Sequence, residues 1–237
     1  MSDLKTALPE GFKAGLEGIV AGTSAIAEVD AQKDALVYRG YAAHELAEKC
    51  SFEEVSFLLL HGQLPNLTEL AAFKAELSQN RTLSPFTLDS LKRLPGTANP
   101  MVALRVGITR AYLEDPDGDR TDVEANLRKA KRLVALAPTI TAAISRLHRG
   151  QEPIAPDPSL DSAANFLYME SGKKPDPAIA RILDSTMTLY GEHGFNASTF
   201  AARVTASTLS DMHSAVASAI GALKGPLHGG ANEQAID

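Results

Sequence analysis

One histidine stands inside a turn of small and rigid residues close to the end of the printed sequence. The segment reads Gly225-Pro226-Leu227-His228-Gly229-Gly230-Ala231-Asn232-Glu233. Its glycines accept backbone angles that other residues avoid, and they let a ligand approach the main chain closely. We interpret His228 as one half of an active site. The alternative is that His228 caps the last carbonyl groups of the helix expected before it.

A second segment places a histidine and an amide three residues apart. Glu192-His193-Gly194-Phe195-Asn196-Ala197-Ser198-Thr199 spans the expected end of one helix and the start of the next. An imidazole and an amide beside a helix N-terminus are suited to hold a small carboxylate. His193 and Asn196 are therefore candidate binding residues. The alternative is purely structural, because Asn, Ser and Thr are also preferred N-cap residues.

The remaining chemistry-bearing patterns favour structural roles. His44, His61, His148 and His213 lie in amphipathic helical patterns, and no two histidines have the spacing of a helical zinc site. The segment that begins at Asp115 resembles a calcium loop, but its sixth position is Arg120 and its twelfth is Asn126. Calcium loops need glycine and glutamate there. We therefore predict a solvated turn and no metal site.

Composition narrows the class of protein. Hydrophobic residues make up 44% of the 237 residues and charged residues 22%, which is typical of a globular protein. The net charge of −6 and the aromatic content of 5% argue against nucleic-acid binding. Cys50 is the only cysteine, so an internal disulfide is excluded. GxSxG, P-loop and GxGxxG motifs are absent, which argues against the enzyme classes that depend on them.

No apolar run reaches the length of a membrane span, and the first residues lack the pattern of a signal peptide. We therefore expect a soluble cytoplasmic protein without a membrane partner. The length suits one large domain, or one domain with part of another.

The elements that position these residues are mostly helical. Two short β-branched runs, Ile26 to Val29 and Leu36 to Tyr38, predict a hairpin within about 18–40, with its loop at Asp30 to Asp34. Helices follow over about 41–224, and the His228 turn covers 225–233. Capping signals mark several helix starts: Ser51 with Glu54, Asn66 with Glu69, Thr121 with Glu124, and Ser84-Pro85, Asn99-Pro100 and Asp176-Pro177.

Further signals interrupt or end the helices. Pro138 should kink or break the helix that contains it, Gly150 to Pro158 reads as a connector, and Gly172 should end a helix. Two patterns rich in small residues, Ala197 to Leu209 and Asp211 to Leu223, predict helices that approach closely. They form either an internal helix pair or a subunit interface. The predicted fold class is all-α with a minor hairpin.

At the two histidine segments the chain closely resembles the citrate synthase family. The resemblance is carried by Glu192 to Val204 and by Ala219 to Glu233, and it is collinear over essentially the whole chain. Supporting stretches are Gly15 to Gly22, Tyr38 to Tyr41, Ser51 to Leu60, Asn99 to Arg105 and Ala164 to Tyr168.

The resemblance implies a multi-helix large domain of that family and an acyltransferase activity. The family condenses acetyl-CoA with oxaloacetate to citrate and CoA, the entry step of the tricarboxylic acid cycle, with acetyl-CoA as a substrate and no cofactor. By this resemblance His228 stabilises the enol oxygen, while His193 and Asn196 contact oxaloacetate. A neutral imidazole in a fixed turn is suited to that task because it donates to developing negative charge. The resemblance also implies a homodimer formed through the small-residue helices.

Two departures from the family pattern bear on activity. Gly194 stands where the family often has a larger residue, so we expect a looser local turn. The family's second catalytic histidine, its catalytic aspartate and its small domain would lie beyond Asp237, so we expect a partial large domain that turns over negligibly alone. Two alternatives to citrate synthase remain, a 2-methylcitrate synthase that uses propionyl-CoA and a non-catalytic helical dimerisation scaffold.

Overall fold

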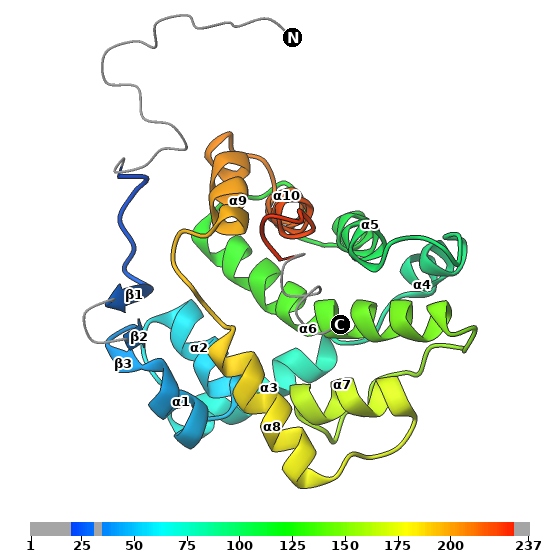
Figure 1. The fold of residues 1–237 in the computed structure, drawn as a ribbon, viewed down its shortest axis with the longest axis horizontal. Coiled ribbons are helices and arrows are strands. Elements are labelled where there is room, and N and C mark those ends of the chain that lie inside the picture. Colours follow the sequence, from blue (N-terminus) through cyan, green and yellow to red (C-terminus); the bar gives the residue numbers. More distant parts are fainter. Residues whose placement is uncertain (1–19, 31–34, 230–237) are drawn as a thin grey trace, which may run out of the picture.

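The computed structural model describes residues 20–30 and 35–229 as a small antiparallel sheet followed by a helical body (Figure 1). The strands are β1 (Ala27–Asp30), β2 (Ala35–Tyr38) and β3 (Tyr41–Ala42). The helices are α1 (Ala43–Lys49), α2 (Phe52–His61), α3 (Leu67–Gln79), α4 (Pro85–Lys92), α5 (Pro100–Tyr112), α6 (Val123–His148), α7 (Ser162–Ser171), α8 (Pro177–Leu189), α9 (Ala197–Ser207) and α10 (Met212–Leu223). The predicted all-α class with a hairpin is confirmed.

The sheet has the order β1-β2-β3, with both pairs antiparallel. Ala27 pairs with Tyr38 and Val29 with Leu36, so the predicted hairpin is present, while part of its predicted loop lies outside the described residues. The two-residue strand β3 was not predicted. It follows a tight turn in which Arg39 and Gly40 have φ values of 49° and 91°. This left-handed geometry folds the chain back on β2. The hydrophobic pattern of the sequence does not predict this turn.

Most helices begin where the sequence predicts. Ser51 accepts a hydrogen bond from the Glu54 amide, and the Glu54 carboxylate accepts one from the Ser51 amide at 2.7 Å, which is the expected capping box. Asn66 and Glu69 make the same pair of contacts at α3. The helices α4, α5 and α8 each begin with proline after a side-chain cap.

The start of α6 corrects one prediction. The N-cap is Asp122, whose carboxylate accepts a hydrogen bond from the Ala125 amide at 3.0 Å, and Thr121 lies one residue outside the helix. Both residues are suited to capping, and the carboxylate also interacts favourably with the positive end of the helix. Pro138 does not break α6, which continues from Val123 to His148 and bends along its length (Figure 1).

Three clusters of buried apolar side chains hold the elements together. The first lies between α4, α5 and α6 and contains Leu91, Ala103, Ile108, Leu133, Ile140, Ala143 and Ile144. The second joins the hairpin to α1 and α2 and contains Tyr38, Ala43, Leu46, Val55 and Leu58. The third joins α2, α3 and α6 through Phe57, Phe73, Leu77 and Ala135. The hairpin is therefore anchored in the helical body by its own side chains.

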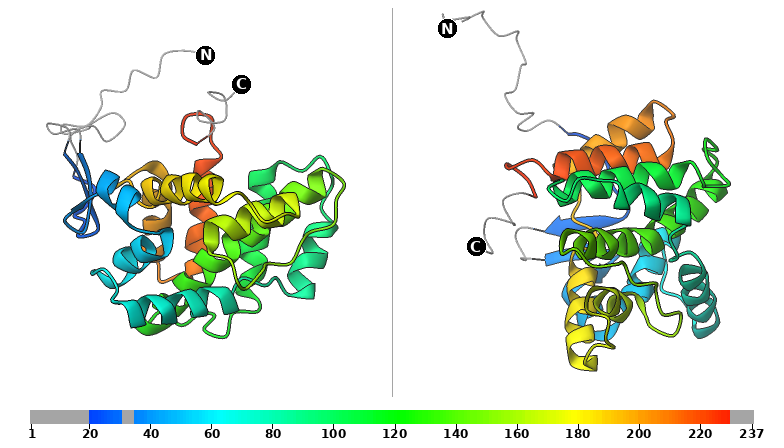
Figure 2. Two further views of the ribbon diagram at one scale, coloured as in Figure 1. Left: turned by 90° about the horizontal axis from the view of Figure 1, so that it is seen from below. Right: turned by 90° about the vertical axis from the view of Figure 1, so that its right-hand side faces the viewer.

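The two small-residue helices pack on each other. The helix α10 lies between α9 and α5 and packs partly buried Met212, Val216 and Ile220 against the first cluster (Figures 1 and 2). The hydroxyl of Thr205 on α9 donates to that of Ser218 on α10 at 3.0 Å. These contacts support the internal helix pair, one of the two interpretations of the sequence. In the described residues, no helix combines the length and apolar character that a bilayer span requires.

Candidate active site

The first part of the candidate site is the loop between α8 and α9. Its backbone turns at Gly194, which has φ of 70°, and the Gly194 amide donates to the carboxylate of Glu192 at 2.7 Å. Because a side chain is strained at this φ, glycine suits the backbone angle of this turn. The expectation of a looser turn stays a prediction. His193 lies within this turn with an exposed side chain.

Asn196 ends the same loop and is the N-cap of α9. Its side-chain oxygen Oδ1 accepts a hydrogen bond from the Thr199 amide at 2.9 Å. The structural interpretation of Asn196 is thus correct as far as Oδ1 is concerned. Capping does not engage the amide nitrogen Nδ2, which keeps its two protons as donors. The residue stands at the positive end of a helix, where anions are favoured.

The second part of the candidate site is the turn after α10. The His228 amide donates to the carbonyl of Gly225 at 2.9 Å and closes the turn. A Cβ atom on Gly229 would lie 2.5 Å from the carbonyl oxygen of Leu223 and 2.6 Å from its Cδ1. Glycine is therefore required after the histidine, because any side chain would force the turn away from α10. Residues 230–233 of the predicted turn lie outside the described part of the chain.

One hydrogen bond joins the two parts. The Ser198 hydroxyl on the first turn of α9 lies 2.7 Å from Nε2 of the half-buried His228. This contact brings the His228 turn to the helix end that Asn196 caps. His193 precedes that cap by three residues in the same loop, and its exposed side chain makes no contact that would tie it to His228. The three predicted residues therefore come from adjoining segments: Asn196 caps α9 with its side chain, and His228 contacts Ser198 in the first turn of the same helix.

From the sequence alone, Ser198 is only a possible cap. Its partner lies 30 residues further along the chain, at the far end of a helix pair. Helical periodicity and capping spacing do not predict a contact over this separation. It could be predicted only from the pairing of the two helices: if α9 and α10 are antiparallel neighbours, the start of α9 and the end of α10 must meet.

The loop is also packed against the N-terminal segment. The guanidinium of Arg203 on α9 stacks over the ring of Phe195 at 4.8 Å from its centroid. A Cβ atom on Gly22 would lie 3.3 Å from both side chains. The absence of a side chain at Gly22 therefore permits close packing beside the candidate site.

The other histidines have packing or surface positions, as predicted. His213 on α10 is 1% exposed, and burial lowers its pKa, which favours the neutral ring. His61 stacks on Phe57 with ring centroids 4.1 Å apart. His44 and His148 are exposed on α1 and α6.

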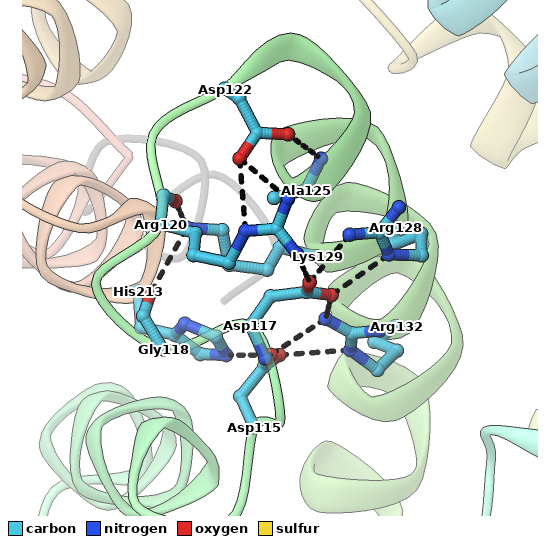
Figure 3. Close-up of polar contacts among 10 residues, drawn as sticks. All are labelled: Asp115, Asp117, Gly118, Arg120, Asp122, Ala125, Arg128, Lys129, Arg132 and His213. Carbon is cyan, nitrogen blue, oxygen red and sulfur yellow. Dashed lines mark hydrogen bonds and ion pairs between the residues drawn. The ribbon is translucent and has the colours of Figure 1, made fainter.

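The calcium-like segment is neutralised by arginine side chains of α6 (Figure 3). The guanidinium of Arg132 donates to both carboxylate oxygens of Asp115, at 2.9 and 2.6 Å. Arg128 does the same to Asp117, at 3.0 and 2.5 Å. Bidentate pairs of this kind are among the stronger charge-assisted hydrogen bonds. They hold the pKa of Asp117 well below its usual range, with the Arg128 contact as the largest cause.

A buried ammonium group completes this cluster. Lys129 is fully buried and donates to the carbonyl oxygens of Gly118 at 3.0 Å and of Arg120 (Figure 3). The loop carbonyls that could face a cation are thus bound by a side chain of the protein itself. Within residues 20–30 and 35–229, no group of three or more His, Cys, Asp or Glu side chains is arranged to hold a metal ion. These contacts make the segment a structural turn. The side chains of Asp115 and Asp117 are buried, so the expectation of a solvated turn is wrong for these two carboxylates.

Comparison with known proteins shows the family to which this chain belongs. The family model for the citrate synthase C-terminal domain matches residues 15–237. The 2-methylcitrate synthase of Mycobacterium tuberculosis H37Rv is 50% identical, over 94% of this chain and 56% of its own length. The citrate synthase of Haloferax volcanii is 48% identical, over 93% of this chain and 59% of its own length.

Solved structures give the same result. The citrate synthase of Pyrobaculum aerophilum superposes with a TM-score of 0.90 at 42% identity, covering 94% of this chain and 57% of its own. Citrate synthase from Thermoplasma acidophilum, in a ternary complex with carboxymethyl coenzyme A and oxaloacetate, has a TM-score of 0.91 at 28% identity, covering 96% and 60%. The chain spans a little over half the length of these relatives. On the family match and these identities, the chain belongs to the citrate synthase family.

Proposed function

We propose that this chain carries part of an active site that condenses acetyl-CoA with oxaloacetate and water to give citrate and free CoA. The observation that carries the proposal is the hydrogen bond between Ser198 and His228. It connects the glycine-framed imidazole to the helix end beside His193 and Asn196. Two segments that a scaffold would have no need to join are thus held together by a polar contact.

The contact bears on the chemistry of His228. A neutral imidazole has one nitrogen that donates and one that accepts. If the Ser198 hydroxyl donates to Nε2, the ring proton resides on Nδ1 and is available to the substrate. His228 then donates from Nδ1 to the enol oxygen that forms when the thioester methyl group loses a proton. Removing one such donor typically lowers kcat by about 10²- to 10³-fold.

Oxaloacetate would bind at the start of α9. It is a dianion, and the helix N-terminus attracts negative charge. Asn196 would donate from Nδ2 while its Oδ1 keeps the cap. His193 would donate from the adjoining turn, and its exposed position leaves it accessible to a ligand.

The acyl-CoA substrate is either acetyl-CoA or propionyl-CoA. A 2-methylcitrate synthase is 50% identical to this chain and a citrate synthase 48%, so both chemistries occur among similar proteins. Comparison of kcat/KM for acetyl-CoA and propionyl-CoA in the full gene product distinguishes them, since one methylene in a pocket is worth about 10- to 200-fold in specificity.

We also propose a cytoplasmic homodimer that requires no cofactor. On α9, Phe200 and Val204 are 41% and 52% exposed and lie one helical turn apart, which suits an apolar contact with a second copy. Light scattering of the purified protein measures the mass. A Val204→Asp variant that stays at the mass of the wild-type dimer would place the contact elsewhere.

Calorimetric titration with oxaloacetate tests the site. The full gene product should bind, and His193→Ala should weaken binding by at least about tenfold, the effect of losing a hydrogen bond to a charged group. His148→Ala is the matched control, because that exposed histidine lies at the end of α6. The absence of binding heat in the wild-type protein would favour the non-catalytic scaffold.

A further inference from the structure

The hydroxyl group of Tyr38 lies between the hairpin and the loop that carries His193. Tyr38 is on β2 and fully buried. Its hydroxyl donates to the carbonyl oxygen of Leu189 at 2.8 Å and accepts from the amide of Glu192 at 3.2 Å. Both partners are more than 150 residues away in sequence. One oxygen atom therefore fixes two backbone groups of a distant segment.

These two backbone groups belong to the end of α8. Leu189 is the last residue of the helix, and the amides of Tyr190 and Gly191 still bond back to Thr186 and Thr188. The carbonyl of Leu189 and the amide of Glu192 would pair with each other if the chain continued through one more tight turn. The Tyr38 hydroxyl stands between them and bonds to both. The chain consequently leaves the helix direction at this point while both groups keep partners.

The same residue, Glu192, continues the support to the other side of His193. Its backbone amide is held by Tyr38, and its carboxylate accepts the Gly194 amide at 2.7 Å. The residues before and after His193 are thus both fixed, the first by Tyr38 and the second by Glu192. The exposed imidazole has no such support of its own. Its position depends on the backbone that these contacts hold.

The surroundings of Tyr38 keep the hydroxyl in place and protonated. Its ring packs in the cluster of the hairpin, α1 and α2, with Leu46 and Leu58 among its members. Burial raises the pKa of Tyr38, so the phenol stays neutral and retains the proton that it donates to Leu189. The neighbouring Arg39, in the turn after β2, donates to the carbonyl of Leu59 on α2 at 3.3 Å and to the carbonyl of Ala25 before β1 at 3.1 Å. The first of these contacts ties the turn to the helical body.

We propose that Tyr38 is a positioning residue for His193, acting through the backbone of Leu189 and Glu192 to set the geometry of the oxaloacetate site. The part of this inference that concerns oxaloacetate rests on the proposed function. The part that concerns the loop does not. Tyr38 touches neither substrate nor reacting atoms in this assignment, and its effect reaches His193 only through the main chain.

The test compares Tyr38→Phe with Tyr112→Phe in the full gene product. Each change removes one hydroxyl that donates a hydrogen bond, and the Tyr112 hydroxyl donates to Asp119 at 2.7 Å, away from the loop. In Tyr38→Phe, hydrogen exchange at the Glu192 amide should rise about tenfold, and the ring signals of His193 in NMR spectra should shift. Oxaloacetate should bind about tenfold more weakly. Tyr112→Phe should show none of these changes, even if both variants melt at similar temperatures.

Several results would overturn the assignment. Equal exchange at Glu192 in the two variants would mean that Tyr38 does not hold the loop. A Glu192 amide that exchanges as fast as an open loop amide in the wild-type protein would mean the same, whether or not the variant folds. An unchanged affinity in Tyr38→Phe, with His193→Ala impaired, would refute positioning and leave the proposed function intact. Faster exchange in a protein whose wild type does not bind oxaloacetate would support the loop contact and refute the substrate role.

Discussion

An imidazole ring has only two nitrogen atoms, and in His228 one of them is already in contact with Ser198. Which nitrogen of the ring can donate to a substrate therefore depends on whether the Ser198 hydroxyl donates or accepts in this contact. A hydroxyl that donates to Nε2 leaves the proton on Nδ1, whereas an unpaired ring exchanges between tautomers. In the proposed site, the serine would act by orienting the His228 ring and by setting which of its two nitrogens carries the proton.

We expect Ser198→Ala to lower kcat for condensation roughly ten- to hundredfold in the full gene product, because a misplaced catalytic group costs about that much. The KM for oxaloacetate should change little, since Ser198 acts on His228. Ser198→Thr keeps the hydroxyl and should recover most of the rate. Steady-state kinetics with both substrates measure these effects, and an alanine variant with wild-type kcat would refute the role.

At the scale of single residues, resemblance to a family predicted His193, Asn196 and His228 as site residues. It did not identify the side chains that hold them. Ser198 and Tyr38 act on partners 30 and more than 150 residues away. Such contacts are determined by tertiary packing, and the local spacing of residues in the sequence does not predict them.

At the scale of elements, Gly107 decides how closely α5 and α6 approach. A Cβ atom at this position would lie 2.6 Å from Cγ2 of Ile140, a fully buried side chain on α6. Glycine inside a helix is less favourable than alanine by about 1 kcal/mol. The close contact between α5 and α6 explains why glycine is present in α5, because any side chain at this position would push the two helices apart.

Gly107→Ala should therefore lower the free energy of unfolding, by about 1–3 kcal/mol for overpacking, despite the better helix propensity of alanine. Gly96→Ala is the control, because a Cβ atom there meets nothing within 4 Å. The double variant Gly107→Ala/Ile140→Ala should lose less free energy of unfolding than the two single variants lose in total. The reason is that Ile140→Ala opens space for the methyl group added at Gly107. Urea unfolding followed by circular dichroism gives all of these values. A stabilised Gly107→Ala variant would show that α5 and α6 can separate without cost.

The limits of helices were the most predictable feature of the chain. Capping boxes and N-terminal prolines fixed the starts of α2, α3, α4, α5 and α8 because caps are local chemistry. The start of α6 was misplaced by one residue, since Thr121 and Asp122 are both suited to capping and only the observed hydrogen bond separates them. The strand β3 was missed because two residues are too few to form a pattern.

At the scale of the whole molecule, the ion pairs of Asp117 with Arg128 and Arg132 on α6 make the stability of the fold depend on pH. Asp117 is 7% exposed, and its contacts with Arg128 and Arg132 lower its pKa. A carboxylate whose pKa is lower in the folded than in the unfolded protein stabilises the fold above its unfolded pKa of about 3.9. That contribution is lost progressively as the pH falls below this value, toward the pKa of the folded state.

Asp117→Asn should accordingly be less stable than the wild-type protein at pH 6, and the difference should narrow as the pH falls below about 4. Urea unfolding at several pH values between about 3 and 6 measures the two curves. Asp89→Asn, on the exposed side of α4, controls for the removal of one carboxylate from the surface. A constant difference between Asp117→Asn and wild type at all pH values would show that Asp117 titrates alike in both states.

The pairing of α9 with α10 has a consequence for how the chain can change in length. The helices have 11 and 12 residues, and the contact between Ser198 and His228 closes the open end of their hairpin. Each residue added to one helix alone would move its end by about 1.5 Å and rotate it by about 100°. Single insertions or deletions within either helix would therefore dismantle the contact. Only changes that lengthen or shorten both helices together would preserve it, so these two segments should vary in length as one unit.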